Sequence, residues 1–164
     1  MGRLTVKQKV QKWLRLSLED PIATILVQNS NLTKTQVESL LIDVLSENMA
    51  PRPLKYEEKG SFRLVKAGVS RGSFNRSLRQ ARTNVIQAIY TILLLGYLGV
   101  FDSIRLASYL EISDKLQTYM NAYREISGTT KVEDDHLRLM NMLRDELRTT
   151  LERLTKPKSM SHTM

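Results

Sequence analysis

Four side chains that can hydrogen-bond the edges of nucleic-acid bases recur within nine residues of the chain. They are Arg71, Asn75, Arg76 and Arg79. Arginine can donate two hydrogen bonds to guanine, and asparagine can pair in the same way with adenine. At helical spacing the apolar residues of this stretch, Phe74, Leu78 and Ala81, fall on the opposite face. The pattern predicts a helix with an apolar inner face and a basic outer face.

Other polar residues flank this predicted helix. Arg63, Lys66 and Arg82 lie near its edges and suit contacts with phosphates, which position a nucleic acid without specifying its sequence. Ser73 lies among the arginines and would face the DNA with them. Ser70 is placed to cap the helix, because its hydroxyl can accept a hydrogen bond from a free backbone amide of the first turn. We therefore expect these residues to belong to one DNA-binding surface.

The positive charge of the chain is concentrated around this stretch. The whole chain carries a formal charge of +8 with a pI near 9.8, which is typical of proteins that meet a polyanion. Between residues 52 and 82 nine lysines and arginines stand against Glu57 and Glu58 alone, a local charge of +7. The location of the charge thus favours binding over a generally solvated surface.

The first half of the chain predicts helices and loops. A basic amphipathic helix is expected over 4–18, either touching a polyanion or packing its Trp13 face on the core with lysines in solvent. The run 22–27 is compatible with helix or strand. Thr33 and Gln36 form a capping-box pattern before a helix that reaches about residue 47. Its expected inner face consists of Val37, Leu40, Leu41, Val44 and Leu45.

The residues on either side of the basic helix predict a loop, a short helix and two turns. A loop is expected over 49–60 and a short helix over 62–67, followed by a tight turn at Gly68. The basic helix should then continue from Arg71 through an apolar, buried stretch to about residue 95. A turn over 96–102 would end it.

Two amphipathic helices are expected in the C-terminal third. The first, 103–126, repeats aromatic and aliphatic residues every seven positions, and the second, 132–154, carries a leucine stripe. Joined by a short loop, they predict an antiparallel hairpin whose seam is either an intramolecular core or a dimer interface. Residues 156–164 are expected to form a disordered tail.

Residues 68–85 resemble the helix-turn-helix of bacterial transcription regulators, and most closely the fourth region of sigma factors. The matching positions are Gly68, Val69, Ser70, Gly72, Ser73, Phe74, Leu78, Ala81, Arg82 and Val85. The likeness is weaker over 32–67, where Arg63 and Leu64 depart from the apolar and small residues of the family. The resemblance implies an all-α fold in which the helix from Arg71 enters the major groove of double-stranded DNA.

These observations define an expected organisation. A helical DNA-binding domain over 1–101 would contain the helix-turn-helix at about 61–82, and the hairpin over 102–155 would serve for homodimerisation. The expected function is a cytoplasmic, sequence-specific transcription regulator. The alternatives are a helical adaptor or assembly subunit with a basic surface, and a DNA binder that structures the nucleoid.

Enzymatic and membrane functions find little support in the sequence. There is no cysteine, no phosphate-cradling glycine loop, and no nucleophile with a plausible base, so we expect no catalytic site, cofactor or metal. The acidic run 133–136 with its histidine is explained by the preference for negative charge at a helix start. The apolar run 85–101 is too short and too interrupted for a membrane span.

Overall fold

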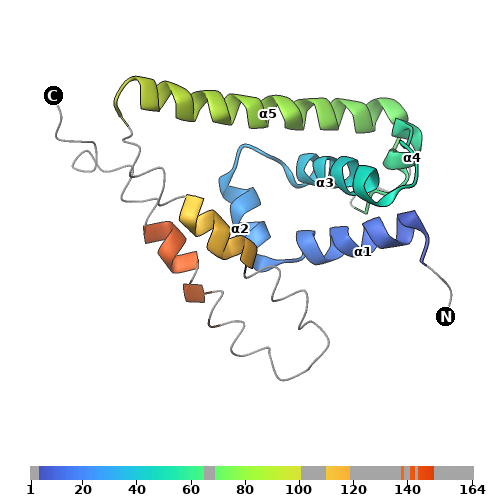
Figure 1. Ribbon diagram of the computed structural model, residues 1–164, viewed down its shortest axis with the longest axis horizontal. Coiled ribbons are helices and arrows are strands. Elements are labelled where there is room, and N and C mark those ends of the chain that lie inside the picture. The colour runs from blue at the N-terminus through green and yellow to red at the C-terminus, as the bar shows by residue number, and fades with distance from the viewer. Residues whose placement is uncertain are drawn as a thin grey trace. The chain divides into compact units, whose positions relative to one another are not determined.

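The computed structural model describes residues 4–64, 69–100, 110–118, 138, 141–142 and 144–149 (Figure 1). Within these ranges every regular element is a helix and there is no strand, which confirms the expected all-α class. The named helices are α1 (Val6–Leu18), α2 (Pro21–Asn29), α3 (Lys34–Met49), α4 (Tyr56–Gly60) and α5 (Arg71–Tyr97).

The chain divides into two compact units, Met1–Ile89 and Tyr90–Met164. The division falls inside α5, whereas the sequence placed it after residue 101. The first unit contains α1 to α4 and the basic part of α5, so it holds all the residues expected to meet DNA.

Local capping chemistry sets the beginnings of the first three helices. The Thr5 and Thr33 side chains accept from the backbone amides of Gln8 and Gln36, and both capping boxes are complete. At α2 the Asp20 carboxylate accepts from Ala23, and Pro21 occupies the first helical position, where its missing N–H costs nothing. The ambiguous run 22–27 is therefore helical.

The core of the first unit is a cluster from α1, α3, α5 and the segment after α4. Its buried apolar members are Val10, Leu14, Leu18, Ile42, Phe62, Phe74 and Leu78. Helix α1 packs on α3 and keeps Lys7, Lys9, Lys12 and Arg15 exposed. The structure thus favours the second of the two roles considered for 4–18, in which the helix covers the core.

Helix α3 faces the core differently from the prediction. Val44 is 55% exposed and the other expected inner residues are half-buried. The buried positions are instead Ile42 and four polar residues, namely Glu38, Ser39, Asp43 and Ser46. Val37, Leu40, Leu41 and Leu45 nevertheless pack against the core cluster, so the predicted inner face is wrong only at Val44. The prediction missed the polar residues buried beside it, because their partners are basic side chains that come later in the chain.

The segment before the basic helix is also different. A helix was expected over 62–67, but residues 62–64 form a turn and a coil, and the helical residues are those of α4 inside the expected loop 49–60. Ser61 ends α4 by donating its amide to carbonyls of the last turn, and Phe62 then enters the core. Ten residues, 61–70, separate α4 from α5. Gly68 and Lys66 lie outside the described residues.

Helix α5 confirms the central prediction. It begins at Arg71, and Phe74, Leu78 and Ala81 are its buried residues. The Ser70 hydroxyl accepts from the Ser73 amide at 3.2 Å, so Ser70 caps the helix as expected.

The second half of α5 contradicts the expectation of a buried apolar stretch. Between residues 85 and 100 no side chain is buried; Ile86, Ile89 and Leu93 are 53%, 52% and 61% exposed. The three buried residues of the 27-residue α5, Phe74, Leu78 and Ala81, all lie in its first three turns. No helix of the described part of the chain is long and apolar enough to cross a membrane.

The expected turn after the basic helix is present. Gly99 has φ +72°, a conformation that glycine adopts without a Cβ penalty. The Val100 amide donates to the Leu95 carbonyl and the Gly99 amide to the Gly96 carbonyl, the two bonds of a Schellman motif.

The C-terminal unit is described in part. Residues 110–118 are helical, which confirms the middle of the helix expected over 103–126. Positions 138, 141–142 and 144–149 are helical too, in agreement with the helix expected over 132–154. The link between these helices, the residues 156–164 and the acidic run 133–136 lie outside the described residues, so the hairpin and its role in dimerisation stay predictions.

Candidate nucleic-acid interface

The first three turns of α5 present most of the residues expected to meet DNA. Ser70, Arg71 and Ser73 are exposed at its start. Asn75, Arg76 and Arg79 are exposed along the next two turns. The sequence pattern therefore placed these six side chains on the surface correctly, while their contact with DNA remains a prediction.

Arg63 does not share this surface. Its residue is 3% exposed, its guanidinium lies 5.5 Å from the centre of the Phe74 ring, and one terminal nitrogen donates to the Ser39 hydroxyl at 2.6 Å. Burial lowers the pKa of Arg63, and the nearby Glu38 carboxylate, with Oε2 4.0 Å from Nε, opposes that change. The expectation of an exposed phosphate contact at Arg63 is wrong, because the polar face of α3 draws the side chain inward.

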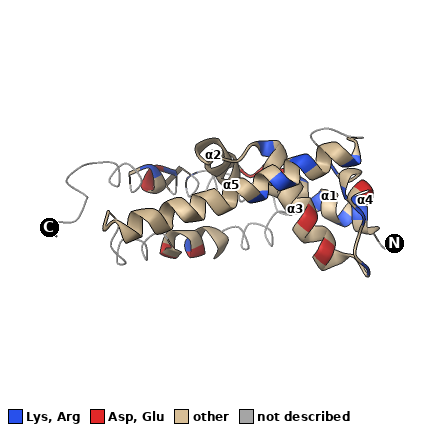
Figure 2. Ribbon diagram, turned by 90° about the horizontal axis from the view of Figure 1, so that it is seen from above, with Lys and Arg blue, Asp and Glu red and all other residues tan. Residues whose placement is uncertain are grey.

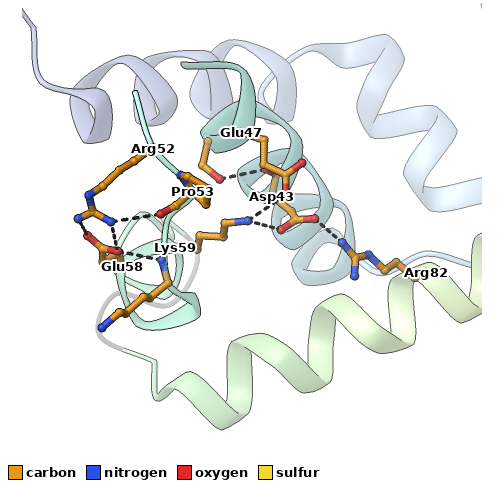
Figure 3. Close-up of polar contacts among 9 residues, drawn as sticks. Asp43, Glu47, Arg52, Pro53, Glu58, Lys59 and Arg82 are labelled. Atoms are coloured by element: carbon orange, nitrogen blue, oxygen red, sulfur yellow. Dashed lines mark hydrogen bonds and ion pairs between the residues drawn. The ribbon is translucent and has the colours of Figure 1, made fainter. Parts of the chain in front are cut away.

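Arg82 is exposed but already has an acidic partner. Its guanidinium lies 2.6 Å from one carboxylate oxygen of Asp43, whose other oxygen lies 2.7 Å from the Lys59 ammonium (Figure 3). Lys59 and Asp43 are 4% and 5% exposed. Asp43 therefore joins α3 to α4 and α5 through one carboxylate, and Arg82 contributes to the fold at this point.

Two more of the nine cations between 52 and 82 are paired on the surface. Arg52 forms two hydrogen bonds with the Glu58 carboxylate, at 2.7 and 3.3 Å (Figure 3). Chiefly through the hydrogen bond between the two side chains, this contact lowers the pKa of Glu58 and raises that of Arg52. Arg71 lies 3.6 Å from Glu57, with both side chains more than 60% exposed, so this pair is weak and easily exchanged.

The local charge of +7 therefore overstates the free basic surface. Lys66 lies outside the described residues, and five of the other eight cations lie within 4.0 Å of a carboxylate. The three that have no ion pair with any described residue are Lys55, Arg76 and Arg79. Two of these three lie on α5.

Arg76 and Arg79 lie on the side of α5 that points away from the core. Counting 100° per residue, Gly72, Arg76, Arg79 and Thr83 form a stripe opposite the buried face of Phe74, Leu78 and Ala81. We call this stripe the outward face of α5. In Figure 2 the basic colouring of α5 is confined to its N-terminal half, and the remainder is uncharged.

Gly72 leaves the outward face open at its beginning. A Cβ built on Gly72 would meet no atom of the described residues within 4 Å, so packing against them does not require glycine there. Glycine costs a helix about 0.5–1 kcal/mol relative to alanine. The open space at Gly72 would allow the backbone of the first turn to approach a partner closely.

Sequence reasoning missed the acidic residues that organise this surface, above all Glu38 and Asp43. The sequence does contain a sign of these ion pairs, because two carboxylates interrupt the apolar pattern of α3 and the segment that follows is rich in cations. What the sequence did not reveal is which cation each carboxylate meets, since the partners lie 16 to 39 residues apart.

No protein-family model, curated protein or solved structure matches this chain. The resemblance to helix-turn-helix regulators therefore stays a prediction from the residues. Among the described residues no three histidine, cysteine or acidic side chains gather in a way that could hold a metal ion.

Proposed function

We propose that this protein binds double-stranded DNA through the outward face of α5 and acts as a sequence-specific transcription regulator. The observation that carries the proposal is the pair of exposed arginines, Arg76 and Arg79, that have no ion pair with any described residue and follow a glycine in open space. An arginine held by a carboxylate must break that contact to bind a phosphate or a base, whereas these two are available.

The dimensions of α5 suit the major groove. The groove admits one helix, and the N-terminal half of that helix meets the base edges. Arg76 and Arg79 would reach guanine or the phosphates, and Asn75 on the adjoining stripe would reach adenine. Arg71 joins them by exchanging its weak contact with Glu57 for the DNA. Arg82, tied to Asp43, serves to hold α5 in place.

A charge-matched pair of double variants tests this assignment. Arg76→Ala with Arg79→Ala removes two positive charges from the outward face, and Lys9→Ala with Arg15→Ala removes two exposed positive charges from α1. Each base contact contributes about 1–3 kcal/mol of discrimination, so the first variant should bind a selected DNA site roughly a hundredfold more weakly. The second should lose only the small, salt-dependent share due to net charge.

The measurement is fluorescence anisotropy with a site selected from a random DNA pool, compared with unrelated DNA. Equal losses in the two variants would mean that the chain binds through its overall basicity, the nucleoid-structuring alternative. Wild-type affinity in the α5 variant would reject α5 as the reading helix.

We further propose that the C-terminal region, with helical residues at 110–118 and 144–149, dimerises the protein. Two symmetric copies would place two α5 helices about 34 Å apart, one turn of DNA. Selected sites should accordingly be palindromic with half-sites about 10 base pairs apart. Non-palindromic sites bound by a monomer in analytical ultracentrifugation would refute this arrangement.

One observation favours the adaptor as a second candidate. Ile86, Ile89, Leu93 and Tyr97 are all more than half exposed along the uncharged part of α5, a surface suited to protein contacts. A complete absence of DNA binding at low salt, where phosphate contacts are strongest, would favour this candidate.

A further inference from the structure

The short helix α4 packs against the first turn of α5, and both lie in the first compact unit. The centre of the Tyr56 ring is 6.4 Å from the centre of the Phe74 ring. A Cβ built on Gly60 would stand 3.6 Å from the Cβ of Phe74, so the two helices approach closely at this point. The exposed residues of α4 are therefore neighbours of the start of α5.

Several polar contacts hold α4 in place. The buried Lys59 ammonium lies 2.7 Å from the Asp43 carboxylate of α3 (Figure 3). The Glu58 carboxylate binds Arg52 at 2.7 Å and accepts from the Lys55 amide at 2.8 Å. These contacts, with the ring packing, fix the backbone of α4. The Cα of the remaining acidic residue of this helix, Glu57, therefore has a defined position beside α5.

The Glu57 side chain extends toward the first residue of α5. Its Oε1 lies 3.6 Å from Nη1 of Arg71. The two side chains are 62% and 67% exposed, so water screens the pair and it opens readily. Glu57 is thus a carboxylate at the surface, on a fixed helix, directly beside an arginine that we expect to meet DNA.

DNA binding would leave this carboxylate without its cation. When the Arg71 guanidinium moves to a base or a phosphate, Glu57 remains within one side-chain length of the same DNA. The phosphates repel a carboxylate at that distance, because the duplex carries a dense negative charge. Glu57 is compatible with binding where it meets a hydrogen-bond donor on a base edge.

The major groove limits which base can supply that donor. Guanine presents two acceptors there, and thymine presents an acceptor and a methyl group. Adenine presents an amino donor next to the N7 acceptor, whereas cytosine presents its N4 amino group alone. A carboxylate, which only accepts hydrogen bonds, therefore matches cytosine and is opposed by the acceptors of the other three bases.

We propose that Glu57 accepts a hydrogen bond from the N4 amino group of a cytosine at the base pair nearest the start of α5. The inference rests on the proposed function, since the DNA bound to α5 supplies that base. Glu57 is then a specificity-determining residue contributed by α4. The reading surface extends from α5 onto the helix that packs against its first turn.

Three variants of the full chain test this contact. Glu57→Gln keeps the size of the side chain and removes its charge, and glutamine pairs with adenine in two bonds. Glu58→Gln is the matched control, because it removes the same charge one residue away from a carboxylate that contacts Arg52. Arg71→Ala distinguishes direct reading by Glu57 from an effect that passes through Arg71. Circular dichroism checks that each variant is folded.

The measurement is selection from a random DNA pool, followed by fluorescence anisotropy on the selected sites. Glu57→Gln should replace the cytosine of one position by adenine and leave the other positions unchanged. Changing that cytosine should weaken wild-type binding about tenfold, a typical effect of one mismatched base pair, and weaken Glu57→Gln less than about twofold. Glu58→Gln and Arg71→Ala should keep the preference for cytosine.

The outcomes separate this inference from the proposed function. Specific binding by the wild type, with the same selected sequence in Glu57→Gln, overturns Glu57 as a reader and leaves the outward face of α5 standing. Loss of the cytosine in Arg71→Ala as well shows that Glu57 acts by holding Arg71, which also overturns the direct contact. An equal gain in affinity for all DNA in Glu57→Gln and Glu58→Gln reduces Glu57 to charge repulsion and overturns the inference too. No sequence-specific binding by the wild type overturns the proposed function, and this inference falls with it.

Discussion

Replacing Gly72 with alanine separates the stability of α5 from its proposed contact with DNA. Gly72 is the second residue of α5, and an added Cβ would meet no atom within 4 Å in the part of the chain that the structure describes. The substitution therefore creates no clash and removes the flexibility that glycine adds to the unfolded chain, which should stabilise the protein by about 0.5–1 kcal/mol. For a unit of this size the melting temperature should rise by about 2–8 °C.

The same methyl group should weaken DNA binding. If the backbone at Gly72 approaches DNA closely, the Cβ forces a shift of the kind seen on overpacking, which costs about 1–3 kcal/mol. That corresponds to a roughly 5- to 150-fold higher Kd. The variant should thus be more stable and bind less tightly, a combination that general damage to the fold does not produce.

The assay pairs thermal denaturation with anisotropy on the selected DNA site. Gly96→Ala is the matched control, since Gly96 also lies in α5 with no atom within 4 Å of its added Cβ, 24 residues from Gly72. It should leave DNA affinity unchanged. Unchanged or higher affinity in Gly72→Ala would refute close approach at the start of α5.

Three further predictions concern the fold and its pH dependence. Asp43→Ala leaves the Lys59 ammonium buried without its closest carboxylate and should lower the free energy of unfolding in urea by about 3–5 kcal/mol; a loss below 1 kcal/mol would contradict the pairing. Phe74→Ala removes a fully buried ring and should cost about 3–5 kcal/mol by the same assay, with little change if α5 packs through another face. The lowered pKa of Glu58 means that its contribution to stability is full above its unfolded pKa and is lost as pH falls through the folded value. Arg52→Ala should bring the Glu58 carboxyl pKa measured by NMR back toward its ordinary value, and an unchanged pKa would contradict the hydrogen bond as the main cause.

The basic surface near α5 was overestimated from the sequence because net charge does not show pairing. Lys59 and Arg63 are buried beside α3, and Arg82 shares Asp43 with Lys59. Buried pairs of this kind contribute modestly to net stability but are costly to break. They connect the orientation of α5 to α3, so substitutions in α3 should change the proposed DNA binding indirectly, through the placement of α5.

The sequence by itself determined the features that depend on neighbouring residues. Thr33 with Gln36 predicted a helix start, and the spacing of Phe74, Leu78 and Ala81 predicted the buried face of α5. Caps and helical periodicity act over three to seven residues, so their pattern is visible in the linear chain. The all-α class follows from these local signals.

Only the tertiary structure decided which polar residues are buried together. From the sequence, Glu38 and Asp43 belonged to the expected polar face of an amphipathic helix, and Arg63 was expected to be an exposed cation. The structure buries all three. Their placement depends on contacts across 16 to 39 residues, where the fold brings opposite charges into a region of low water access. Burial of a charge is stable only beside its partner, and that pairing is a property of the assembled helices.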